Sequence, residues 1–333
     1  MATEMKKNNK IKVVSLFCGC GGTDLGLVGG FSYLDKWYPA TRKIKIIHAS
    51  DIDSKVVETY NLNFKHKARV VDVSNLSFPE GYADIVIGGF PCQAFSTVNP
   101  TKKPHHRENQ LFWQMSRIIG EIRPRVFIAE NVKGFYRLGG GKYFKLAKRS
   151  FEDKDYTVHD SLLNSSDFGV PQLRERLFLI GIHNSFDLSF EFPKPTHGPD
   201  SIKKLPKTCL RDAIENLFPA DPKYYFSKKA VEGVKKAKPN MKRALAQNLN
   251  GQCLTITSHL AKVSLNSRDP VLLVDAEREL YRRFTPREAS RIQSFPDSFR
   301  FNGSERDAYR QIGNAVPPVV MWHLGRAILK QIF

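Results

Sequence analysis

Cys92 has the surroundings of a reactive cysteine. It lies in the segment GGFPCQAFS (88–96), directly after a β-branched run that predicts a strand. Open α/β sheets bind ligands at the carboxyl ends of their strands, so we expect this cysteine at a ligand-binding edge. The basic run at 102–107 favours the nucleophilic thiolate form of a nearby cysteine, although it could equally hold phosphate groups. The pattern predicts a nucleophile at Cys92.

Glu130 and the pair Arg174 and Arg176 complete a candidate reaction centre. Glu130 ends the apolar run RVFIAE, so it is expected at the same sheet edge as Cys92. A carboxyl group there can hold or protonate a ring nitrogen while a nucleophile adds to the ring. In VPQLRER (170–176), alternation places both arginines on one face of an extended segment. Two adjacent guanidinium groups suit recognition of a carbonyl or a phosphate, but a solvated surface strand would carry the same pattern.

A glycine-rich turn, FCGCGG (17–22), follows the first predicted strand. Glycines allow a sharp turn into a helix and a close approach to a ligand, which predicts a nucleotide-like cofactor there. Asp51 ends the second strand, where it can bind ribose hydroxyls, and Asp72 ends the third strand at the same edge. Asp24 stands where the dinucleotide fingerprint has its third glycine, which disfavours a pyrophosphate-containing cofactor.

The elements that must position these residues alternate between residues 11 and 183. Seven β-branched runs are separated by helix-like stretches, which is typical of βαβ units and of a mainly parallel, doubly wound α/β sheet. Apolar residues at helical spacing predict helices over Asp53–Asn63, Gln110–Ile122 and within Ala315–Phe333. The predicted strands are 11–17, 44–50, 68–73, 83–89, 125–130, 156–163 and 176–182.

Residues 184 to about 280 break this alternation and predict a second, smaller unit. They are rich first in Pro, then in Lys, then in Asn, Gln and Thr, and residues 201–243 alone hold twelve Lys or Arg. The whole chain has 52 Lys and Arg against 33 Asp and Glu, a net charge of +19. A charge of this size predicts a polyanionic partner, with nucleic acid as the first choice.

The remaining composition is that of a water-soluble intracellular protein. Of the 333 residues, 41% are hydrophobic and 26% charged, and no apolar run approaches the ~18 residues of a membrane span. The N-terminus lacks the apolar core of a secretory signal. Five cysteines, an odd number without the paired spacing of zinc sites, predict free thiols and no metal.

The order of these motifs resembles that of the DNA cytosine-C5 methyltransferases, and closely that of the compact bacterial members of restriction-modification systems. The resemblance implies a Rossmann-like, S-adenosylmethionine-dependent methyltransferase sheet with a smaller target-recognition domain. It covers the whole chain except the middle of the second unit. The matching segments are SLFCGCGG, Asp51 and Asp72, GGFPCQAFS, ENV (130–132), QLRER, RRFTPREASRIQSFPDSF (282–299) and QIGNAVPP (311–318).

The resemblance implies a covalent mechanism. Cys92 would add to carbon 6 of a cytosine flipped out of duplex DNA, while Glu130 contacts ring nitrogen 3 and the exocyclic amine. Carbon 5 would then take the methyl group, and loss of its proton with elimination of the thiol would release 5-methylcytosine. Arg174 and Arg176 would support the catalytic site, with Arg176 near the cytosine carbonyl.

S-adenosylmethionine is the cofactor that the resemblance implies. The residues that fall on cofactor-lining positions of the family are Phe17, Cys18, Gly19, Cys20, Gly22, Asp51, Ile52, Asp72, Val73, Pro91, Leu111, Asn314, Ala315 and Val316. The chain departs from the family pattern at Cys18, often alanine or serine, and at Asp51, often glutamate. The insertion-like WYPATRK (37–43) also lengthens the run before the second strand.

The resemblance further divides the chain into two domains with DNA in the cleft between them. Residues 1–183 and 305–333 would form the catalytic and cofactor-binding domain, and 184–304 the target-recognition domain and hinge.

The expected DNA contacts lie in two segments. In the loop after Cys92 they are Gln93, Ser96 and the phosphate contact Arg107. In NLNGQCLTITSH (248–259) they are Thr255 and Thr257, because Asn, Gln and Thr can bind base edges, although a polar surface loop would have the same composition.

Other functions remain open at this point. A related branch methylates tRNA, but it typically carries Pro-Pro-Cys, whereas Phe90 precedes Pro91 here. A DNA-binding regulator that lost catalysis would usually lack the nucleophile or the glutamate, and a nicotinamide-dependent dehydrogenase is disfavoured by the glycine spacing. The expected setting is a bacterial cytoplasm, associated with the nucleoid through DNA. We expect a monomer that acts on double-stranded DNA, with no membrane, in a system that could include a cognate restriction endonuclease.

Overall fold

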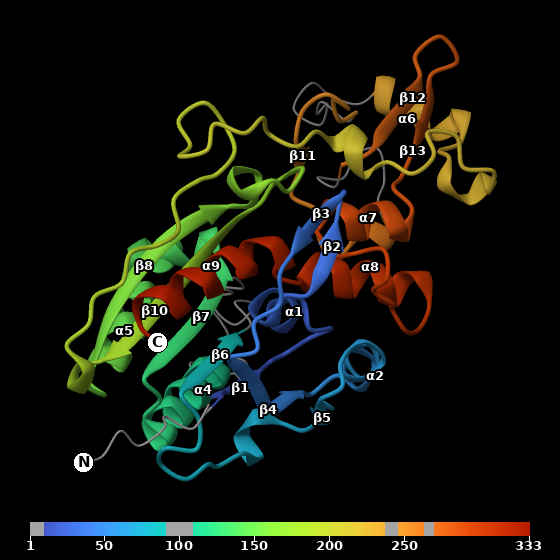
Figure 1. The fold of residues 1–333 in the computed structure, drawn as a ribbon. Helices are drawn as coiled ribbons and strands as arrows, with labels where there is room; N and C mark the ends of the chain where they lie inside the picture. Colours follow the sequence, from blue (N-terminus) through green and yellow to red (C-terminus); the bar gives the residue numbers. More distant parts are fainter. Residues whose placement is uncertain (1–9, 91–108, 237–245, 263–269) are drawn as a thin grey trace.

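A seven-stranded sheet forms the centre of the molecule (Figure 1). The computed structural model describes residues 10–90, 109–236, 246–262 and 270–333. The strand order is β5-β4-β1-β6-β7-β10-β8, and β10 runs antiparallel to both of its neighbours, while the other pairs are parallel. The strands are β1 (Ile11–Leu16), β4 (Ile44–Asp51), β5 (Arg69–Val70), β6 (Ile85–Gly89), β7 (Val126–Val132), β8 (Tyr156–Asn164) and β10 (Glu175–His183).

Helices cover both faces of this sheet, which is why its central strands are apolar on both sides. Along β1, Val13 packs with the helices of one face and Val14 with those of the other. The first face carries α1 (Gly22–Val28), α2 (Ser54–Asn63) and α9 (Pro318–Gln331), and the second carries α4 (Asn109–Ile122) and α5 (Lys142–Glu152) (Figure 1).

The chain between β10 and α9 builds a less regular part around its own apolar cluster. Leu210, Cys253, Ile256 and Leu272 pack there with residues of two helices, among them Ile292. The elements of this part are α6 (Lys228–Lys235), α7 (Pro286–Ile292), α8 (Glu305–Asn314), the pair β12 (Leu272–Asp275) and β13 (Leu280–Arg282), and β11 (Cys253–Leu254). Strand β11 pairs in parallel with β9 (Gln172–Leu173), which precedes β10.

The predicted elements are confirmed with two differences. All seven predicted strands lie in the sheet and the three predicted helices are present, but the run 68–73 pairs with β4 only at Arg69 and Val70. The insertion-like segment 37–43 was expected only to lengthen the run before the second strand. Its first two residues instead belong to β3 (Lys36–Tyr38), which forms a hairpin with β2 (Phe31–Tyr33). Within the described ranges, no helix is long and apolar enough to cross a membrane.

Candidate active site

The loop after β1 is held by Asp51, the last residue of β4. Asp51 Oδ2 accepts a hydrogen bond from Gly19 N at 3.0 Å, and its Oδ1 accepts one from Asp53 N at 3.0 Å. Cys18 N donates to Ser50 O at 3.0 Å. Burial raises the pKa of Asp51, although these N–H donors oppose the rise. The structure therefore places the predicted ribose carboxylate directly beside the glycine-rich turn.

The surroundings of this turn fit S-adenosylmethionine. A Cβ built on Gly19, whose φ is +54°, would meet no atom within 4 Å, so open space lies against the turn. Ile52 follows Asp51 and is 63% exposed although its side chain is large and apolar. An apolar surface, a carboxylate and an open glycine turn are the features that an adenine ring and ribose hydroxyls require.

The end of α8 closes the other side of the turn. A Cβ on Gly22 would lie 2.5 Å from Val316 O. Only glycine therefore lets α1 begin this close to the GNAV segment (313–316). Val316 is buried, Ala315 is half-buried and Asn314 is exposed. The structure thus joins two predicted cofactor motifs from opposite ends of the chain.

The other predicted cofactor positions in the described ranges lie around this edge. Asp72 Oδ1 accepts hydrogen bonds from Ser74 N at 3.0 Å and Ser74 Oγ at 2.8 Å, and Val73 beside it is buried. Phe17 and Leu111 pack against the apolar cluster that α4 shares with the sheet. The two remaining positions, Cys18 and Cys20, are buried thiols.

Glu130 and Arg176 form an ion pair where β7 ends and β10 begins. Arg176 Nε lies 3.2 Å from Glu130 Oε1, and the two side chains are only 14% and 17% exposed. Arg176 Nη1 also donates to Glu175 O at 2.8 Å. Burial raises the pKa of Glu130, whereas Arg176 and Arg174 lower it. The carboxyl group is therefore biased toward protonation compared with an exposed glutamate.

The strand register brings the end of β6, which precedes the predicted nucleophile in the sequence, to the same point. Gly89, the last residue of β6, pairs with Glu130 in β7. The chain therefore leaves the sheet beside Glu130, three residues before Cys92. Cys92 itself lies outside the described residues, as do the predicted site residues Pro91, Gln93, Ser96 and Arg107.

Asn131, which the sequence analysis did not assign a role, fixes the start of that loop. Its Nδ2 donates to Phe90 O at 3.1 Å, while its Oδ1 accepts from Val132 N at 2.8 Å. Phe90 is buried, with its ring against Phe112 and Phe135 at centroid distances of 5.2 and 5.6 Å. The ENV motif contained this residue, but its partner could be identified only in three dimensions.

Arg174 takes a different position from Arg176. It is 1% exposed, and its Nη1 donates to Ile256 O at 3.0 Å, while its Nη2 donates to Gly313 O and Ala315 O at 2.9 Å each. Residue 174 lies between β9 and β10, and its side chain is buried whereas that of Leu173 before it is 40% exposed. Arg174 therefore binds the backbone of the GNAV segment, and together with Arg176 it lowers the pKa of Glu130. Its support of the catalytic site stays a prediction.

Two buried glutamines that the sequence analysis missed extend this contact. Gln172 Nε2 donates to Gln293 Oε1 at 2.7 Å and to Ile292 O at 3.1 Å, and its Oε1 accepts from Ile256 N at 2.9 Å. Gln293 Nε2 donates to Ala315 O at 2.5 Å. Both glutamines are fully buried. They hold the segment after β11 against the segment that borders the cofactor edge.

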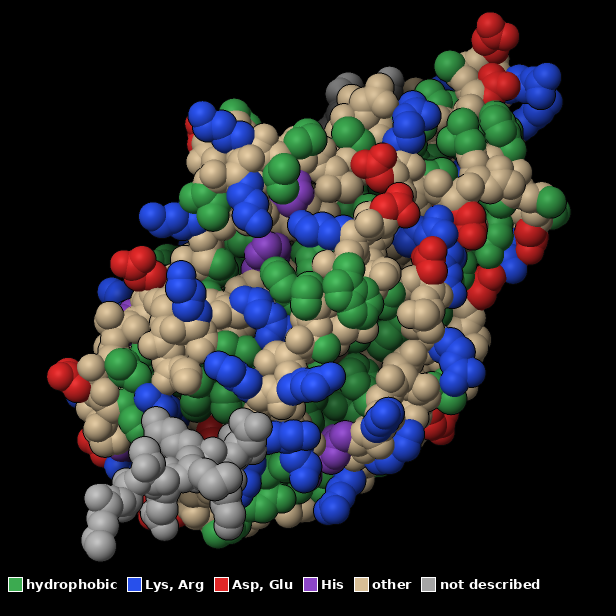
Figure 2. Space-filling model, in the orientation of Figure 1, with side chains coloured by type: hydrophobic (Ala, Val, Ile, Leu, Met, Phe, Trp, Pro, Cys, Tyr) green, Lys and Arg blue, Asp and Glu red, His purple; other side chains and the backbone are tan. Residues whose placement is uncertain are grey.

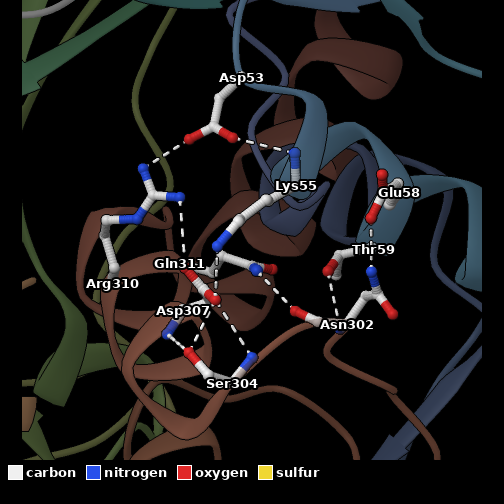
Figure 3. A network of polar contacts seen from close by, with 9 residues as sticks. All are labelled: Asp53, Lys55, Glu58, Thr59, Asn302, Ser304, Asp307, Arg310 and Gln311. Atoms are coloured by element: carbon white, nitrogen blue, oxygen red, sulfur yellow. Dashed lines mark hydrogen bonds and ion pairs between the residues drawn. The ribbon is translucent and has the colours of Figure 1, made fainter.

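A polar network joins the start of α2, just after Ile52, to α8 (Figure 3). Asp53 caps α2 by accepting from Lys55 N at 2.9 Å, and Arg310 Nη1 lies 2.5 Å from Asp53 Oδ2. Lys55 Nζ reaches Asp307 Oδ2 at 2.9 Å. Asp307 in turn caps α8 together with Ser304. The network therefore links the segment that begins at Ile52 to the helix that ends in the GNAV segment.

The predicted base contacts Thr255 and Thr257 are half-buried and bonded within the protein. Thr255 Oγ1 donates to Leu173 O at 2.8 Å, and Thr257 Oγ1 accepts from His259 N at 3.1 Å. Leu254 and Leu173, paired between β11 and β9, are 47% and 40% exposed. The segment therefore lies next to the arginine pair, and its threonines have internal partners.

Comparisons with known proteins agree with this geometry. A family model described as C-5 cytosine-specific DNA methylase matches residues 11–330. The Type II methyltransferase M.BspRI of Lysinibacillus sphaericus is 34% identical over 98% of this chain and 82% of its own length. The Type II methyltransferase M1.ScrFI of Lactococcus lactis subsp. cremoris is 32% identical over 94% and 76%. The crystal structure of the S. pombe Dnmt2 methyltransferase has the same fold, with a TM-score of 0.73, 20% identity, and coverage of 97% of this chain and 100% of its own.

These matches confirm the predicted fold class, the enzyme class, S-adenosylmethionine as methyl donor and DNA as substrate. They also confirm the resemblance to methyltransferases of restriction-modification systems. Because the match extends from β1 to α9, it includes both the glycine-rich turn and the GNAV segment. The chain belongs to the C-5 cytosine-specific DNA methylase family.

Proposed function

We propose that this methyltransferase acts on a cytosine flipped out of a specific short sequence in double-stranded DNA, through a covalent bond from Cys92. The observation that carries the proposal is the register between Gly89 and Glu130, which starts the Cys92 loop beside the Glu130–Arg176 pair. A nucleophile, a carboxyl group biased toward protonation and a guanidinium group would then surround one pyrimidine ring.

In the proposed reaction the Cys92 thiolate forms a bond to carbon 6, and the electron pair of the 5,6 double bond moves toward carbon 5. Glu130, protonated, would hold ring nitrogen 3 and accept a hydrogen bond from the exocyclic amine, and Arg176 would bind the ring carbonyl. Carbon 5 would then form a bond to the methyl group of S-adenosylmethionine, and the donor sulfur would leave with the electron pair of the broken bond. A base would remove the carbon 5 proton, the bond from carbon 6 to the Cys92 sulfur would break, and the double bond would re-form.

Three buried thiols in the described part of the chain are poor alternatives to this nucleophile. Cys18, Cys20 and Cys253 are at most 6% exposed. Burial raises the pKa of Cys20 to about 12 and raises the pKa of Cys18 and Cys253 as well, so these groups stay protonated and unreactive at neutral pH.

S-adenosylmethionine supplies an electrophilic methyl group when it is bound. Asp51 would bind its ribose hydroxyls, Ile52 and Val73 would flank its adenine ring, and the turn from Phe17 to Gly22 would border its amino-acid end. Arg174 would act as a positioning residue, because its donors hold the GNAV backbone.

We also propose the division into a catalytic domain (1–183 with 305–333) and a target-recognition domain with hinge (184–304). The apolar cluster around Leu210 and Leu272 supports a second unit, and it also takes in Ala308, Tyr309 and Ile312 of α8, which the proposed boundary assigns to the catalytic domain. Arg107, Gln93, Ser96, Thr255 and Thr257 are the proposed DNA contacts. In the cell we propose a cytoplasmic monomer, associated with the nucleoid through DNA and accompanied by a cognate restriction endonuclease.

Methyl transfer from tritiated S-adenosylmethionine tests the proposal. Duplex DNA should become labelled and tRNA should not, and Cys92→Ala should abolish labelling while cofactor affinity stays within a few-fold. Bisulfite sequencing of DNA from expressing cells would then identify the methylated sequence. Label in tRNA alone, or undiminished transfer by Cys92→Ala, would contradict the proposal.

A further inference from the structure

Asp53 connects the predicted ribose carboxylate, Asp51, to helix α8. Its backbone N–H donates to Asp51 Oδ1 at 3.0 Å, and its own Oδ2 lies 2.5 Å from Arg310 Nη1 in α8 (Figure 3). The other carboxylate oxygen of Asp51, Oδ2, accepts from Gly19 N at 3.0 Å. A continuous series of contacts therefore runs from α8 through Asp53 and Asp51 to the glycine-rich turn.

Helix α8 also approaches this turn through its carboxyl end. Arg310 lies about one helical turn before Asn314, the last residue of α8, and residues 314–316 are predicted to line the cofactor. Val316 O lies so close to Gly22 that a Cβ there would be only 2.5 Å away. Together the two routes close a ring of contacts that begins and ends at the glycine-rich turn.

The pair of Arg310 and Asp53 is suited to hold a position within this ring. Asp53 is fixed at the start of α2, because its Oδ1 accepts from Lys55 N at 2.9 Å and caps the helix. Lys55 Nζ forms a second link to α8 at 2.9 Å from Asp307 Oδ2, and Asp307 caps α8 together with Ser304. Arg310 and Asp53 are 40% and 27% exposed, so their pair adds little to the stability of the whole fold. Such a contact can still favour one spacing of the two segments that it joins.

We propose that Arg310 and Asp53 are positioning residues for cofactor binding. Their ion pair keeps the segment 51–52 and the GNAV segment at the spacing in which both contact S-adenosylmethionine. Without the pair this arrangement would be populated for only part of the time, and the apparent dissociation constant would rise by the inverse of its population. The energy of a partly exposed ion pair limits the rise to about 5-fold. The inference rests on the proposed cofactor site at Asp51 and Ile52 and assigns two residues that support it.

The test uses two single variants that remove the pair in opposite ways. Asp53→Asn removes a negative charge and keeps a good N-cap for α2, whereas Arg310→Gln removes a positive charge. Because the two variants change the net charge in opposite directions, a loss of affinity in both cannot come from a general charge effect. The double variant Asp53→Asn/Arg310→Gln completes the cycle.

Arg306→Gln is the matched control on the same helix. Arg306 is exposed, and none of the ion pairs found within the described ranges involves it. Lys and Arg side chains are spread over the face of the molecule in Figure 2, so loss of any one arginine also lowers the positive charge that attracts DNA. Binding is therefore measured without DNA, and the control loses the same charge as Arg310→Gln. All variants should unfold within about 4 °C of wild type, which thermal unfolding would verify.

Titration calorimetry with S-adenosylmethionine gives the first readout. Each single variant should bind the cofactor roughly 3- to 5-fold more weakly than wild type, and the control should bind it equally well. The double variant should be no weaker than the single variants, because each of them has already removed the same contact.

Steady-state methyl transfer gives the second readout. The KM for the methyl donor should rise by the same factor as the dissociation constant, while kcat at saturating donor stays within about 2-fold of wild type. This split is expected because neither Arg310 nor Asp53 has a described contact with the Glu130–Arg176 pair. A fall in kcat with an unchanged KM would contradict a role in cofactor binding.

Unchanged cofactor affinity in both single variants, or an equal loss in Arg306→Gln, would overturn the proposal. A double variant weakened by the product of the single effects would overturn the assignment of the two residues as a pair. Asp51→Ala tests the underlying cofactor site separately. If Asp51→Ala weakens binding and the pair variants do not, only the positioning role fails. If Asp51→Ala also binds the cofactor normally, the proposed cofactor site fails, and the positioning role fails with it.

Discussion

Two arginine–carboxylate pairs in this molecule have the same chemistry and different surroundings. In the pair of Arg282 and Glu288, the two contacts are 2.7 and 2.8 Å and both side chains are fully buried. Arg282 also donates to the carbonyl oxygens of Asn216, Leu217 and Arg283, so all its donor atoms have partners. The pair of Arg176 and Glu130 has one contact of 3.2 Å and remains partly exposed.

The difference separates a structural pair from one that can serve a ligand. Glu288 also accepts from Thr285 N at 2.8 Å and caps α7. Both of its carboxylate oxygens therefore have protein partners already, and neither is available to a substrate. Glu130 and Arg176 keep donor and acceptor capacity at the carboxyl edge of the sheet. The family motifs contain both pairs, so saturation of the hydrogen bonds, rather than residue type, indicates which pair can react.

The largest effect should come from the unsaturated pair. Glu130→Gln should slow methyl transfer by roughly 10²- to 10⁴-fold, because an amide cannot exchange a proton with the ring. The free energy of unfolding should change by less than about 1 kcal/mol, since the substitution removes one long contact and a charge that burial disfavours. Single-turnover transfer and urea unfolding measure the two quantities. Transfer within a few-fold of the parent rate would contradict the role of Glu130.

The saturated pair should respond in the opposite way. Glu288→Ala should lower the free energy of unfolding by about 3–5 kcal/mol, because it leaves the buried Arg282 guanidinium without its counter-ion. Methyl transfer per folded molecule should be retained. Urea unfolding, with active-site titration to count folded enzyme, measures both. A loss below about 1 kcal/mol would mean that the pair contributes little to the fold.

A buried polar group without a hydrogen-bond partner, His48, should lower the stability of the folded protein at acid pH. His48 is buried and its Nε2 has no hydrogen-bond partner in the described structure, and burial first, then Arg69 and His66, lowers its pKa to about 4. The unfolded chain binds a proton near pH 6.5, so the stabilising contribution is complete above that pH and is lost as the pH falls toward 4. Wild-type protein should lose about 2 kcal/mol more than His48→Gln between pH 7 and about 4.5. Equal losses would contradict the shifted pKa.

The smallest effect should come from an exposed pair. Arg310 and Asp53 in the α2–α8 network are 40% and 27% exposed, and Arg310→Ala should cost less than about 1 kcal/mol. Thermal unfolding at low and high salt would measure the cost, which should shrink as salt is added. A cost similar to that of Glu288→Ala would remove the distinction between exposed and buried pairs.

The strands, and the residues at their carboxyl ends, could be predicted from the sequence. The strands could be predicted because strands buried on both faces are rich in β-branched residues, as at Val13 and Val14 in β1 and over 85–87 in β6. Residues at strand ends, such as Asp51 and Glu130, could be placed at one edge because parallel strands share it. The third strand was predicted too long because residues 68–73 lie at the sheet edge, where only Arg69 and Val70 pair with β4.

Residues that act through other segments could not be assigned in this way. Arg174 and Arg176 alternate in the sequence, yet Arg174 donates to the GNAV backbone and Arg176 pairs with Glu130. Gln172 and Gln293 are 121 positions apart and meet only because α7 packs against β9. Periodicity carries no information on such contacts, since it describes one element at a time.

The most direct test of the account is covalent trapping. A duplex that carries 5-fluorocytosine at the methylated position has no proton to lose from carbon 5, so the bond from Cys92 should persist once the methyl group is transferred. With methyl donor present, wild-type enzyme should form a denaturant-resistant complex with this DNA, and Cys92→Ala should form none. Absence of the complex with wild-type enzyme on its verified recognition sequence would contradict the covalent mechanism.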